Sequence, residues 1–302
     1  MDGFLVAFLV GLSGGLTNRA HESIIEKIVL RECASSLIHK YDKIINFSRY
    51  RKSKFVLNEP WKNLIVLDAC RYDLFKNYNT ISGNLKKINS AGSHTEEWFK
   101  NNFVGKKCRD IIYISANPQI SNYFINKRYG YNPFLKVVDV WKDKWSDELG
   151  TVCPERVNEV TLENLKIHPE KKYIIHYMQP HFPFIGEFKI ENDIMTLGRK
   201  KILRNQNKSE RVIKTPWYLA SNKLIDINKV IKAHISNLKL VLNTIEKLLP
   251  NLIGKTIITS DHGNLFGEIA HPLLPFKMYM YGHPSHFHVK KLVEVPWLEV
   301  KI

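Results

Sequence analysis

Four short apolar runs, rich in β-branched residues and too short for helices, recur along the chain and predict buried strands. They are LIVL at 64–67, DIIYIS at 110–115, YIIHYM at 173–178 and KTIITS at 255–260. A helix is predicted over residues 226–249, where apolar side chains recur at three- and four-residue steps. This alternation predicts an α/β fold with a mostly parallel central sheet and helices on both faces. Such sheets bind ligands where their strands end.

The first 56 residues predict a helical accessory segment. Apolar positions in residues 20–48 have helical spacing, and the basic stretch RYRKSK at 49–54 is predicted to be a loop. The apolar run FLVAFLVGL at 4–12 is shorter than the roughly 20 residues that a membrane-spanning helix needs. It follows an Asp instead of the basic segment typical of a signal peptide. A packing helix or strand is therefore favoured, with a membrane-surface anchor or an atypical signal as alternatives.

The composition favours anionic partners. The 302-residue chain has 45 Lys and Arg against 29 Asp and Glu, a formal net charge of +16. Nucleic acid, acidic lipid headgroups and a phosphorylated or sulfated substrate all fit this charge. The most basic run, LGRKKILRNQNK at 197–208, has no zinc-finger, basic-zipper or RNA-recognition signature beside it, so a solvated loop explains it equally well.

The cysteines predict a reducing compartment. They are widely spaced and form no CxxC pair, which is typical of buried thiols. Their positions are Cys33, Cys70, Cys108 and Cys153. We therefore expect a cytoplasmic protein, with peripheral contact to membranes compatible with its positive charge.

Residues with metal-binding chemistry follow the last predicted strand. Asp261 and His262 come directly after residues 255–260, and Gly263 allows the chain to turn tightly. An Asp and a His at a strand end can both point into a crevice and bind a divalent cation. The competing interpretation is an Asp that caps a helix beside a hydrogen-bonded His.

Two other strand ends carry candidate residues. Asp68 ends the first predicted strand and can complete a metal site across the sheet. Arg71 can bind an anionic substrate or form a structural salt bridge with Asp73. His176 and His181 flank the end of the third predicted strand, where either ring can contact a ligand oxygen or serve as a structural histidine.

Five segments occur in an order that is itself informative: VLDACRYD, SAGSHTEEWF, HYMQPHFPF, ITSDHGNLFGE and YGHPSHFHVKKLVEVPW. Over roughly residues 61–300 they resemble the alkaline phosphatase-like superfamily, in its sulfatase-like branch, and the SDHGxxxGE segment is the most specific. The resemblance implies that residues 57–302 form an alkaline phosphatase-like catalytic domain.

The resemblance also implies a metal-dependent hydrolase or transferase acting on phosphate or sulfate esters. In the family, a strand-end Asp and an Asp-His pair bind metal, and a Ser, Thr or formylglycine-forming Cys attacks the ester. The implied metal ligands in this sequence are Asp68, Thr95, Asp261 and His262. Thr95 is the implied nucleophile and would form a covalent intermediate. Ser90 and Ser93 stay open as nucleophiles, as does a role for Thr95 as a helix N-cap only.

Two departures from the family shape the expectation. No CxPxR-type signature occurs, so sulfatase activity through formylglycine is not expected. Many members hold a second metal partly through an Asp in the helix before the last strand, but that helix has His234 and Asn237 and no carboxylate here. We therefore expect one divalent cation. Its ligand types suit manganese, zinc, magnesium or calcium to different degrees.

The resemblance places a histidine on the far side of the pocket. His283 is favoured, and the competitors are His271, His286 and His288. His181 or His283 would protonate the leaving group or stabilise charge, while Arg71 and His176 would contact the substrate. Water as the acceptor makes a hydrolase, and a sugar or lipid hydroxyl makes a transferase. The alternative is a basic membrane-surface or nucleic-acid-binding protein on a degenerate sulfatase-like scaffold.

Overall fold

The structure of the chain, a computed structural model, describes residues 49, 51–190, 215–269, 279–285 and 287–301. The predictions for residues 4–12, 20–48 and 197–208 lie outside these residues, as do Cys33, His271 and His286. The boundary at residue 56 between an accessory segment and a catalytic domain therefore stays a prediction. Among the described residues no helix is long and apolar enough to cross a bilayer.

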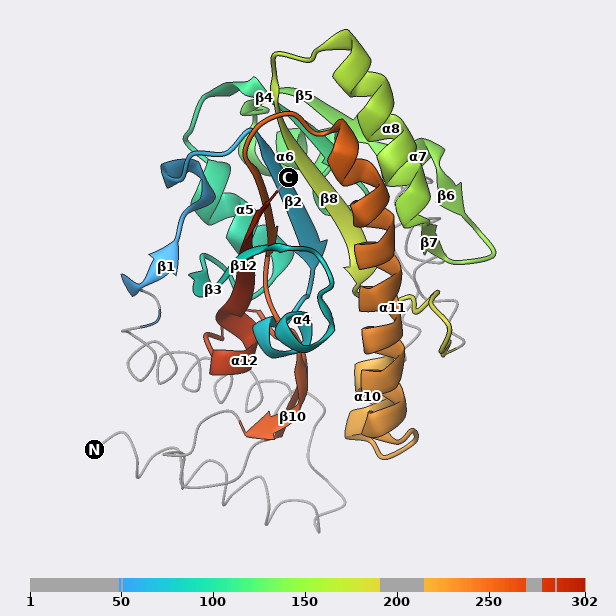
Figure 1. Cartoon of the computed structure of the whole chain (residues 1–302). Coiled ribbons are helices and arrows are strands. Elements are labelled where there is room, and N and C mark those ends of the chain that lie inside the picture. Colours follow the sequence, from blue (N-terminus) through green and yellow to red (C-terminus); the bar gives the residue numbers. More distant parts are fainter. Residues whose placement is uncertain (1–48, 50, 191–214, 270–278, 286, 302) are drawn as a thin grey trace, which may run out of the picture.

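An eight-stranded sheet forms the centre of the molecule and confirms the predicted α/β class (Figure 1). The strand order is β1, β3, β12, β9, β2, β8, β4, β5. Only the two pairings of β12 are antiparallel, so the other seven strands run in one direction. The bounds in this order are Ser53–Lys54, Gly83–Ser90, Glu294–Val300, Thr256–Ser260, Asn63–Asp68, Lys172–Pro180, Cys108–Ser115 and Phe134–Asp139.

The four predicted strands are all present as β2, β4, β8 and β9. β2 lies between β8 and β9, with Ile65 opposite both Ile175 and Ile258, and all six of its residues are buried. A continuous apolar run suits such a strand because helices cover both of its faces. The parallel pairing brings the carboxyl ends of these strands to one edge of the sheet.

The predicted loop at residues 49–54 is wrong in part. Ser53 and Lys54 form the edge strand β1, which pairs with Asn89 and Ser90 of β3. A two-residue edge strand carries no apolar run for a sequence pattern to detect. β3 itself was missed because it is largely solvent-facing, so backbone pairing holds it in the sheet.

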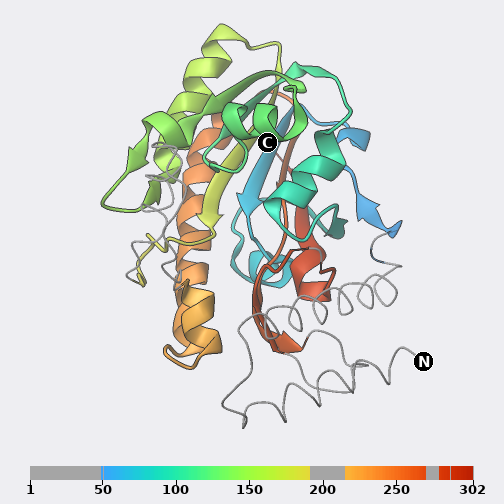
Figure 2. The same cartoon turned by 180° about the vertical axis from the view of Figure 1, so that it is seen from behind.

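Helices cover both faces of the sheet, as predicted (Figures 1 and 2). On β2, Ile65 and Leu67 pack against the core beneath one group of helices, whereas Leu64 and Val66 belong to the opposite core. The first group is α4 (Tyr72–Tyr78), α7 (Val140–Asp143), α8 (Pro154–Ile167) and α11 (Ile227–Leu248). The opposite face carries α5 (Thr95–Phe103) and α6 (Asn122–Tyr129).

The long helix α11 confirms the prediction for residues 226–249. The Asp226 carboxylate caps it by accepting a hydrogen bond of 2.9 Å from the Asn228 amide. The helix ends just before Pro250, whose nitrogen has no hydrogen to donate. α11 packs alongside β8 and therefore reaches the edge of the sheet where the strands end (Figure 1).

Smaller elements complete the described part of the fold. Two antiparallel pairs are β6 (Trp145–Ser146) with β7 (Thr151–Val152), and β10 (Leu265–Ile269) with β11 (Tyr279–Gly282). The short helices are η2 (Val56–Asn58), α10 (Pro216–Ser221), η3 (Leu249–Asn251) and α12 (Lys290–Val293).

Candidate active site

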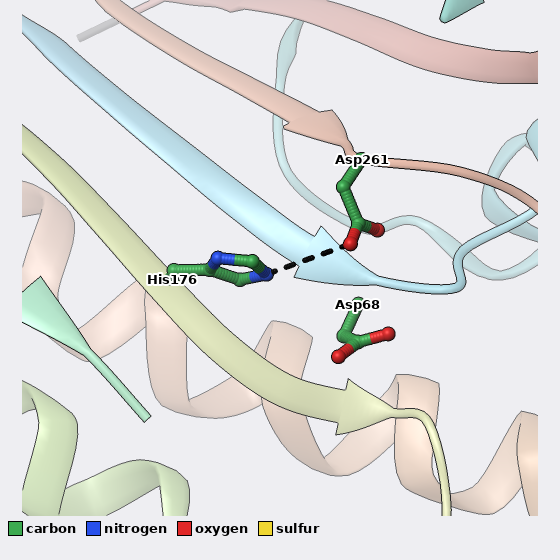
Figure 3. A group of neighbouring side chains, drawn as sticks. All are labelled: Asp68, His176 and Asp261. Carbon is green, nitrogen blue, oxygen red and sulfur yellow. Dashed lines mark ion pairs between the residues drawn. The ribbon is translucent and has the colours of Figure 1, made fainter. Parts of the chain in front are cut away.

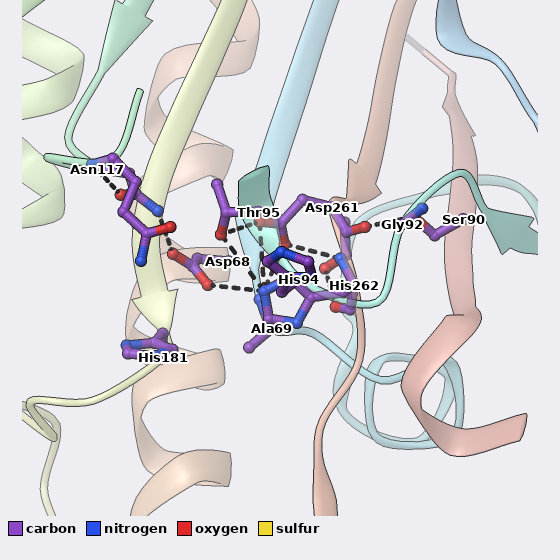
Figure 4. A network of polar contacts seen from close by, with 12 residues as sticks. Asp68, Ala69, Ser90, Gly92, His94, Thr95, Asn117, His181, Asp261 and His262 are labelled. Atoms are coloured by element: carbon purple, nitrogen blue, oxygen red, sulfur yellow. Dashed lines mark hydrogen bonds and ion pairs between the residues drawn. The ribbon is translucent and has the colours of Figure 1, made fainter. Parts of the chain in front are cut away.

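Four predicted residues meet at the carboxyl edge of the sheet (Figure 4). Asp68 ends β2, Thr95 is the first residue of α5, and Asp261 and His262 follow β9. The Thr95 Oγ1 lies 2.8 Å from Asp261 Oδ2 and 3.4 Å from His262 Nε2. The same Nε2 lies 3.6 Å from Asp68 Oδ1 and 3.5 Å from Asp261 Oδ2. All four residues are at least 96% buried.

Backbone amides orient Asp261. Its Oδ1 accepts hydrogen bonds from the Ala69 amide at 3.1 Å and from the His262 amide at 2.8 Å. Ala69 follows β2 directly and has a left-handed backbone with φ of 60°, an unfavourable conformation for a residue with a Cβ. Because Oδ1 is held by these amides, Oδ2 is the oxygen that faces Thr95 and His262.

The tautomer of His262 follows from its neighbours. Its Nδ1 lies 2.7 Å from the Gly263 carbonyl oxygen, which can only accept, so Nδ1 carries the hydrogen. The lone pair is therefore on Nε2, the nitrogen that faces both carboxylates. A histidine whose other nitrogen donates to a carbonyl is the usual arrangement of a metal ligand.

The four donor atoms fit a divalent cation. Tetrahedral ligands at about 2.1 Å from a metal are separated by about 3.4 Å, close to the separations of 3.4–3.6 Å around His262 Nε2. Among the described residues Asp68 Oδ1 has no hydrogen-bond partner although it is buried, whereas its Oδ2 accepts from Asn117 Nδ2 at 2.7 Å. An orphaned carboxylate oxygen beside a second buried carboxylate is what a bound cation would satisfy.

His176 offers a second way to complete this site. Its Nε2 is buried 3.8 Å from Asp261 Oδ2 and has no hydrogen-bond partner in the part of the chain that the structure describes. With Asp68 and Asp261, His176 forms a group whose ligand atoms lie within 4.8 Å of one another (Figure 3). The Tyr113 hydroxyl lies 2.8 Å from its Nδ1. His262 lies closer to the carboxylates and to Thr95, so the geometry favours the ligand set with His262.

The electrostatics of the two buried carboxylates also favour a cation at this site. Burial raises the pKa of Asp68 well above its usual value of 3.8, the charge of Asp261 raises it further, and the Asn117 hydrogen bond partly opposes both effects. Two carboxylates in one buried site repel each other unless a proton or a cation lies between them. The spacing and burial of the two carboxylates therefore suit a bound cation.

Two further histidines line the cavity beside these residues. The ring centroid of His283 lies 4.7 Å from that of His262 and 5.1 Å from that of His181. Burial lowers the pKa of His181 to about 4, although its hydrogen bond to the Phe182 carbonyl raises it. Burial also lowers the pKa of His283, with the neighbouring histidines adding to the effect. Both rings are therefore neutral near pH 7 and present as bases.

A cavity of about 700 Å³ opens from Asp68 and Thr95. Much of its wall is aromatic and comes from elements distant in sequence: α10, β11, β6 and the turn after β8. The aromatic lining residues are Trp145, Phe182, Trp217, Tyr218, Tyr279 and Tyr281. A ligand with a large apolar or planar surface fits such a wall.

The alternative nucleophiles are held in structural hydrogen bonds. Ser90 Oγ donates to the Asp261 carbonyl, and Ser93 Oγ donates to Glu97 at 2.8 Å. His94 occupies the N-cap position of α5, so Thr95 is not the N-cap. Among the three hydroxyls, only that of Thr95 lines the cavity.

The two residues predicted to contact substrate lie elsewhere. Arg71 forms ion pairs with Asp73, at 2.7 Å, and with Glu268, and its guanidinium lies over the Phe266 ring. His176 is fully buried beneath Asp261. Neither lines the cavity. His288, a competitor of His283, is also buried away from the cavity wall.

Several residues of the site were not found from the sequence. Asn117 follows β4, so the rule that ligand-binding residues follow parallel strands could have found it. Tyr113, which orients His176, lies inside the buried β4 and looks like a core aromatic. The aromatic wall has no local pattern, because its members meet only after the chain has folded.

Comparison with known proteins gives matches by structure only, since neither a protein-family model nor a curated protein matches the sequence. The C-terminal periplasmic domain of EcEptC from Escherichia coli, solved with zinc, matches with a TM-score of 0.44 and 13% identity over 82% of this chain and 75% of that chain. The membrane-integral lipooligosaccharide phosphoethanolamine transferase A from Neisseria meningitidis matches with a TM-score of 0.47 and 14% identity over 96% of this chain. The match spans 58% of that protein's own length.

A third match is a protein from Vibrio parahaemolyticus, with a TM-score of 0.42 and 12% identity over 80% of this chain and 60% of that chain. It is described as a member of the alkaline phosphatase superfamily, the family that the sequence motifs resemble.

Proposed function

We propose that this chain is a metal-dependent transferase or hydrolase that acts on a phosphate or sulfate ester through a covalent intermediate on Thr95. The observation that carries the proposal is the position of Thr95 Oγ1, which lines the cavity within 3.4 Å of both Asp261 Oδ2 and His262 Nε2. Metal-assisted group transfer needs a nucleophilic hydroxyl beside groups that can bind a cation. The carboxyl edge of the sheet provides such a hydroxyl together with two buried carboxylates and a histidine lone pair.

Asp68, Thr95, Asp261 and His262 would hold the cation. When bound, the cation lowers the pKa of the Thr95 hydroxyl and stabilises charge on the ester oxygens. Thr95 stands at the N-terminus of α5, where the helix dipole favours both an alkoxide and an anionic ester. Asp261 Oδ2 accepts the hydrogen bond from Thr95 Oγ1 and so orients the nucleophile.

In the first step Thr95 Oγ1 gives its proton to His181 or His283 and bonds to phosphorus or sulfur, while the bond to the leaving oxygen breaks and that oxygen takes the proton from the ring. In the second step water or an alcohol bonds to phosphorus or sulfur, the bond to Thr95 Oγ1 breaks, and the proton of the incoming hydroxyl passes through the same ring to Oγ1. His181 and His283 are neutral and line the cavity, so they can take the proton of the incoming hydroxyl. Once protonated, the same ring can give that proton to the next leaving group.

The first test is the metal content of the protein together with hydrolysis of p-nitrophenyl phosphate, bis-p-nitrophenyl phosphate and p-nitrophenyl sulfate. We expect Thr95→Ala to lower kcat at least about a thousandfold, because a nucleophile that works with its activating groups accounts for a large part of the rate. Thr95→Ser should keep measurable turnover. The preferred ester identifies the reaction class.

Thr161→Ala is the matched control. Thr161 is fully buried in α8, and its hydroxyl donates a hydrogen bond of 2.7 Å to the Val157 carbonyl of the same helix. It should retain full turnover per bound metal. A Thr95→Ala protein that turns over as fast as Thr161→Ala would exclude the threonine intermediate.

A further inference from the structure

The turn after β8, residues 181–188, supplies two residues of the cavity wall. His181 and Phe182 line the cavity, and their rings stack with centroids 4.4 Å apart. The turn lies outside the hydrogen-bonding ladder of the sheet, so its buried carbonyl and amide groups need other partners. Several of these partners come from α11.

One side chain, Asn237, satisfies most of these groups. Its Nδ2 donates to the carbonyl oxygens of His181 and Pro183, both at 3.0 Å. Its Oδ1 accepts from the amides of Ile185, at 2.7 Å, and Gly186, at 3.0 Å. Asn237 is fully buried and uses both donor hydrogens and both acceptor lone pairs of its amide. The side chain therefore fixes the path of the turn on both sides of Phe182.

The surroundings leave the turn little freedom to shift on the helix. Ser236 Oγ accepts a hydrogen bond of 3.1 Å from the Phe188 amide. At Gly186, an added Cβ would meet Ser236 Oγ at 2.3 Å and the Ser236 backbone at 2.7 Å. The turn and α11 are thus in direct backbone contact, and Asn237 lies at the middle of that contact.

The same turn determines the orientation of His181. Nδ1 of its ring donates to the Phe182 carbonyl at 2.6 Å, which leaves the lone pair on Nε2. The Phe182 carbonyl lies between the His181 and Pro183 carbonyls that Asn237 holds. Any rotation of these peptide groups therefore changes both the tautomer and the direction of the His181 ring.

We propose that Asn237 is a positioning residue for His181: it holds the turn after β8 so that His181 Nε2 faces the ester oxygen that gains or loses a proton. This inference rests on the proposed function and names a residue that acts through the backbone of the turn. A displacement of about 1 Å in a catalytic group can cost about a hundredfold in rate.

The test compares leaving groups in the metal-loaded full-length chain. p-Nitrophenolate departs without a proton, whereas an alkyl alkoxide needs one, so a misplaced proton donor harms alkyl esters selectively. Asn237→Asp keeps an oxygen for the Ile185 and Gly186 amides and loses the donors to the carbonyls. The two substrates are an alkyl ester and a p-nitrophenyl ester of the same anion. We expect Asn237→Asp to lower kcat about tenfold or more for the alkyl ester and less than about threefold for the p-nitrophenyl ester.

The double variant with His181→Ala makes the test specific. If Asn237 acts through His181, Asn237→Asp should have no further effect on the alkyl ester once His181 is absent. Asn158→Ala is the control, because Asn158 also joins elements through its side chain, donating to the Thr244 carbonyl at 2.8 Å and accepting from Tyr177. It should affect both esters equally. Equal losses for both esters in Asn237→Asp, or additive effects in the double variant, would overturn the proposal.

A second measurement does not depend on turnover. Long-range 1H–15N spectra of the histidine rings should show a hydrogen on Nδ1 of His181 in the wild type and in Asn158→Ala. In Asn237→Asp the signal should shift toward a mixture of tautomers. If the His181 spectrum of Asn237→Asp is the same as that of the wild type, the positioning role is overturned, whether or not the protein is active. If the Asn237→Asp spectrum differs but the wild type turns over no ester, the result counts against the proposed function alone.

Discussion

Asp68→Asn is expected to abolish cation binding and turnover while making the metal-free protein more stable than the wild type. Asp68 and Asp261 are both buried in one site, and their mutual repulsion has no counterpart in the unfolded chain. An amide at position 68 removes that repulsion and can keep a hydrogen bond to Asn117. We expect metal affinity to fall more than a hundredfold and the metal-free unfolding free energy to rise by about 1–2 kcal/mol.

The pH dependence of this difference has a definite sign. The pKa of Asp68 is raised in the folded protein, so the folded state binds a proton more readily than the unfolded state. The contribution of Asp68 to stability is therefore present below about pH 3.8 and is lost as the pH rises. The advantage of Asp68→Asn over the wild type should grow from pH 4 upward in metal-free protein and vanish when the wild type is loaded with metal.

Denaturant unfolding with and without chelator, at several pH values, measures both effects. Asp110→Asn is the control: Asp110 is exposed near the start of β4 and pairs with Lys172 at 2.9 Å. It should keep metal and activity. A metal-free Asp68→Asn protein less stable than the wild type at pH 7 would contradict a repulsive carboxylate pair.

His234→Phe is expected to stabilise the protein, most strongly in acid. His234 is fully buried in α11, and neither of its ring nitrogens has a hydrogen-bond partner among the residues that the structure describes. Its ring packs among those of Phe184, Trp217 and Phe266, with centroids 5.5–6.4 Å away. A phenyl ring keeps these contacts and removes the buried polar atoms, so we expect a gain of about 1 kcal/mol at pH 7.

The larger effect appears below the ordinary pKa of histidine. Burial lowers the pKa of His234 to about 3, and nearby His181 and Arg71 lower it too. Between pH 6.5 and 3 the imidazole of His234 is therefore protonated in the unfolded chain but not in the folded chain. The wild type loses stability as the pH falls through that range. His234→Phe should lose less stability over the same range.

Urea unfolding at pH 5 and pH 8 measures this difference. His168→Gln is the control for removing a histidine elsewhere, since His168 is half-buried at the C-terminal end of α8. Parallel pH profiles for the wild type and His234→Phe would show that His234 has a polar partner in solution.

The apolar strand runs and the strand-end rule account for much of what could be predicted. β2, β8 and β9 are buried on both faces, so their apolar runs had to be continuous, and the residues that follow them were bound to meet at one edge. Thr95 could not be placed this way. It begins a helix, and only the resemblance of its segment to a known family indicated that it belongs beside Asp261.

The sequence by itself determined the α/β class, the long helix and the set Asp68, Asp261 and His262, because burial and strand direction are written in local patterns. Only the tertiary structure decided the roles of side chains whose partners are distant. It put Arg71 into ion pairs with Asp73 and Glu268, built a cavity wall from aromatics of four elements, and set Asn237 against the turn that carries His181. Hydrogen bonds and ring contacts between distant segments produce no periodic pattern in a sequence. They depend on how helices and strands pack together, whereas sequence patterns report how each helix or strand forms.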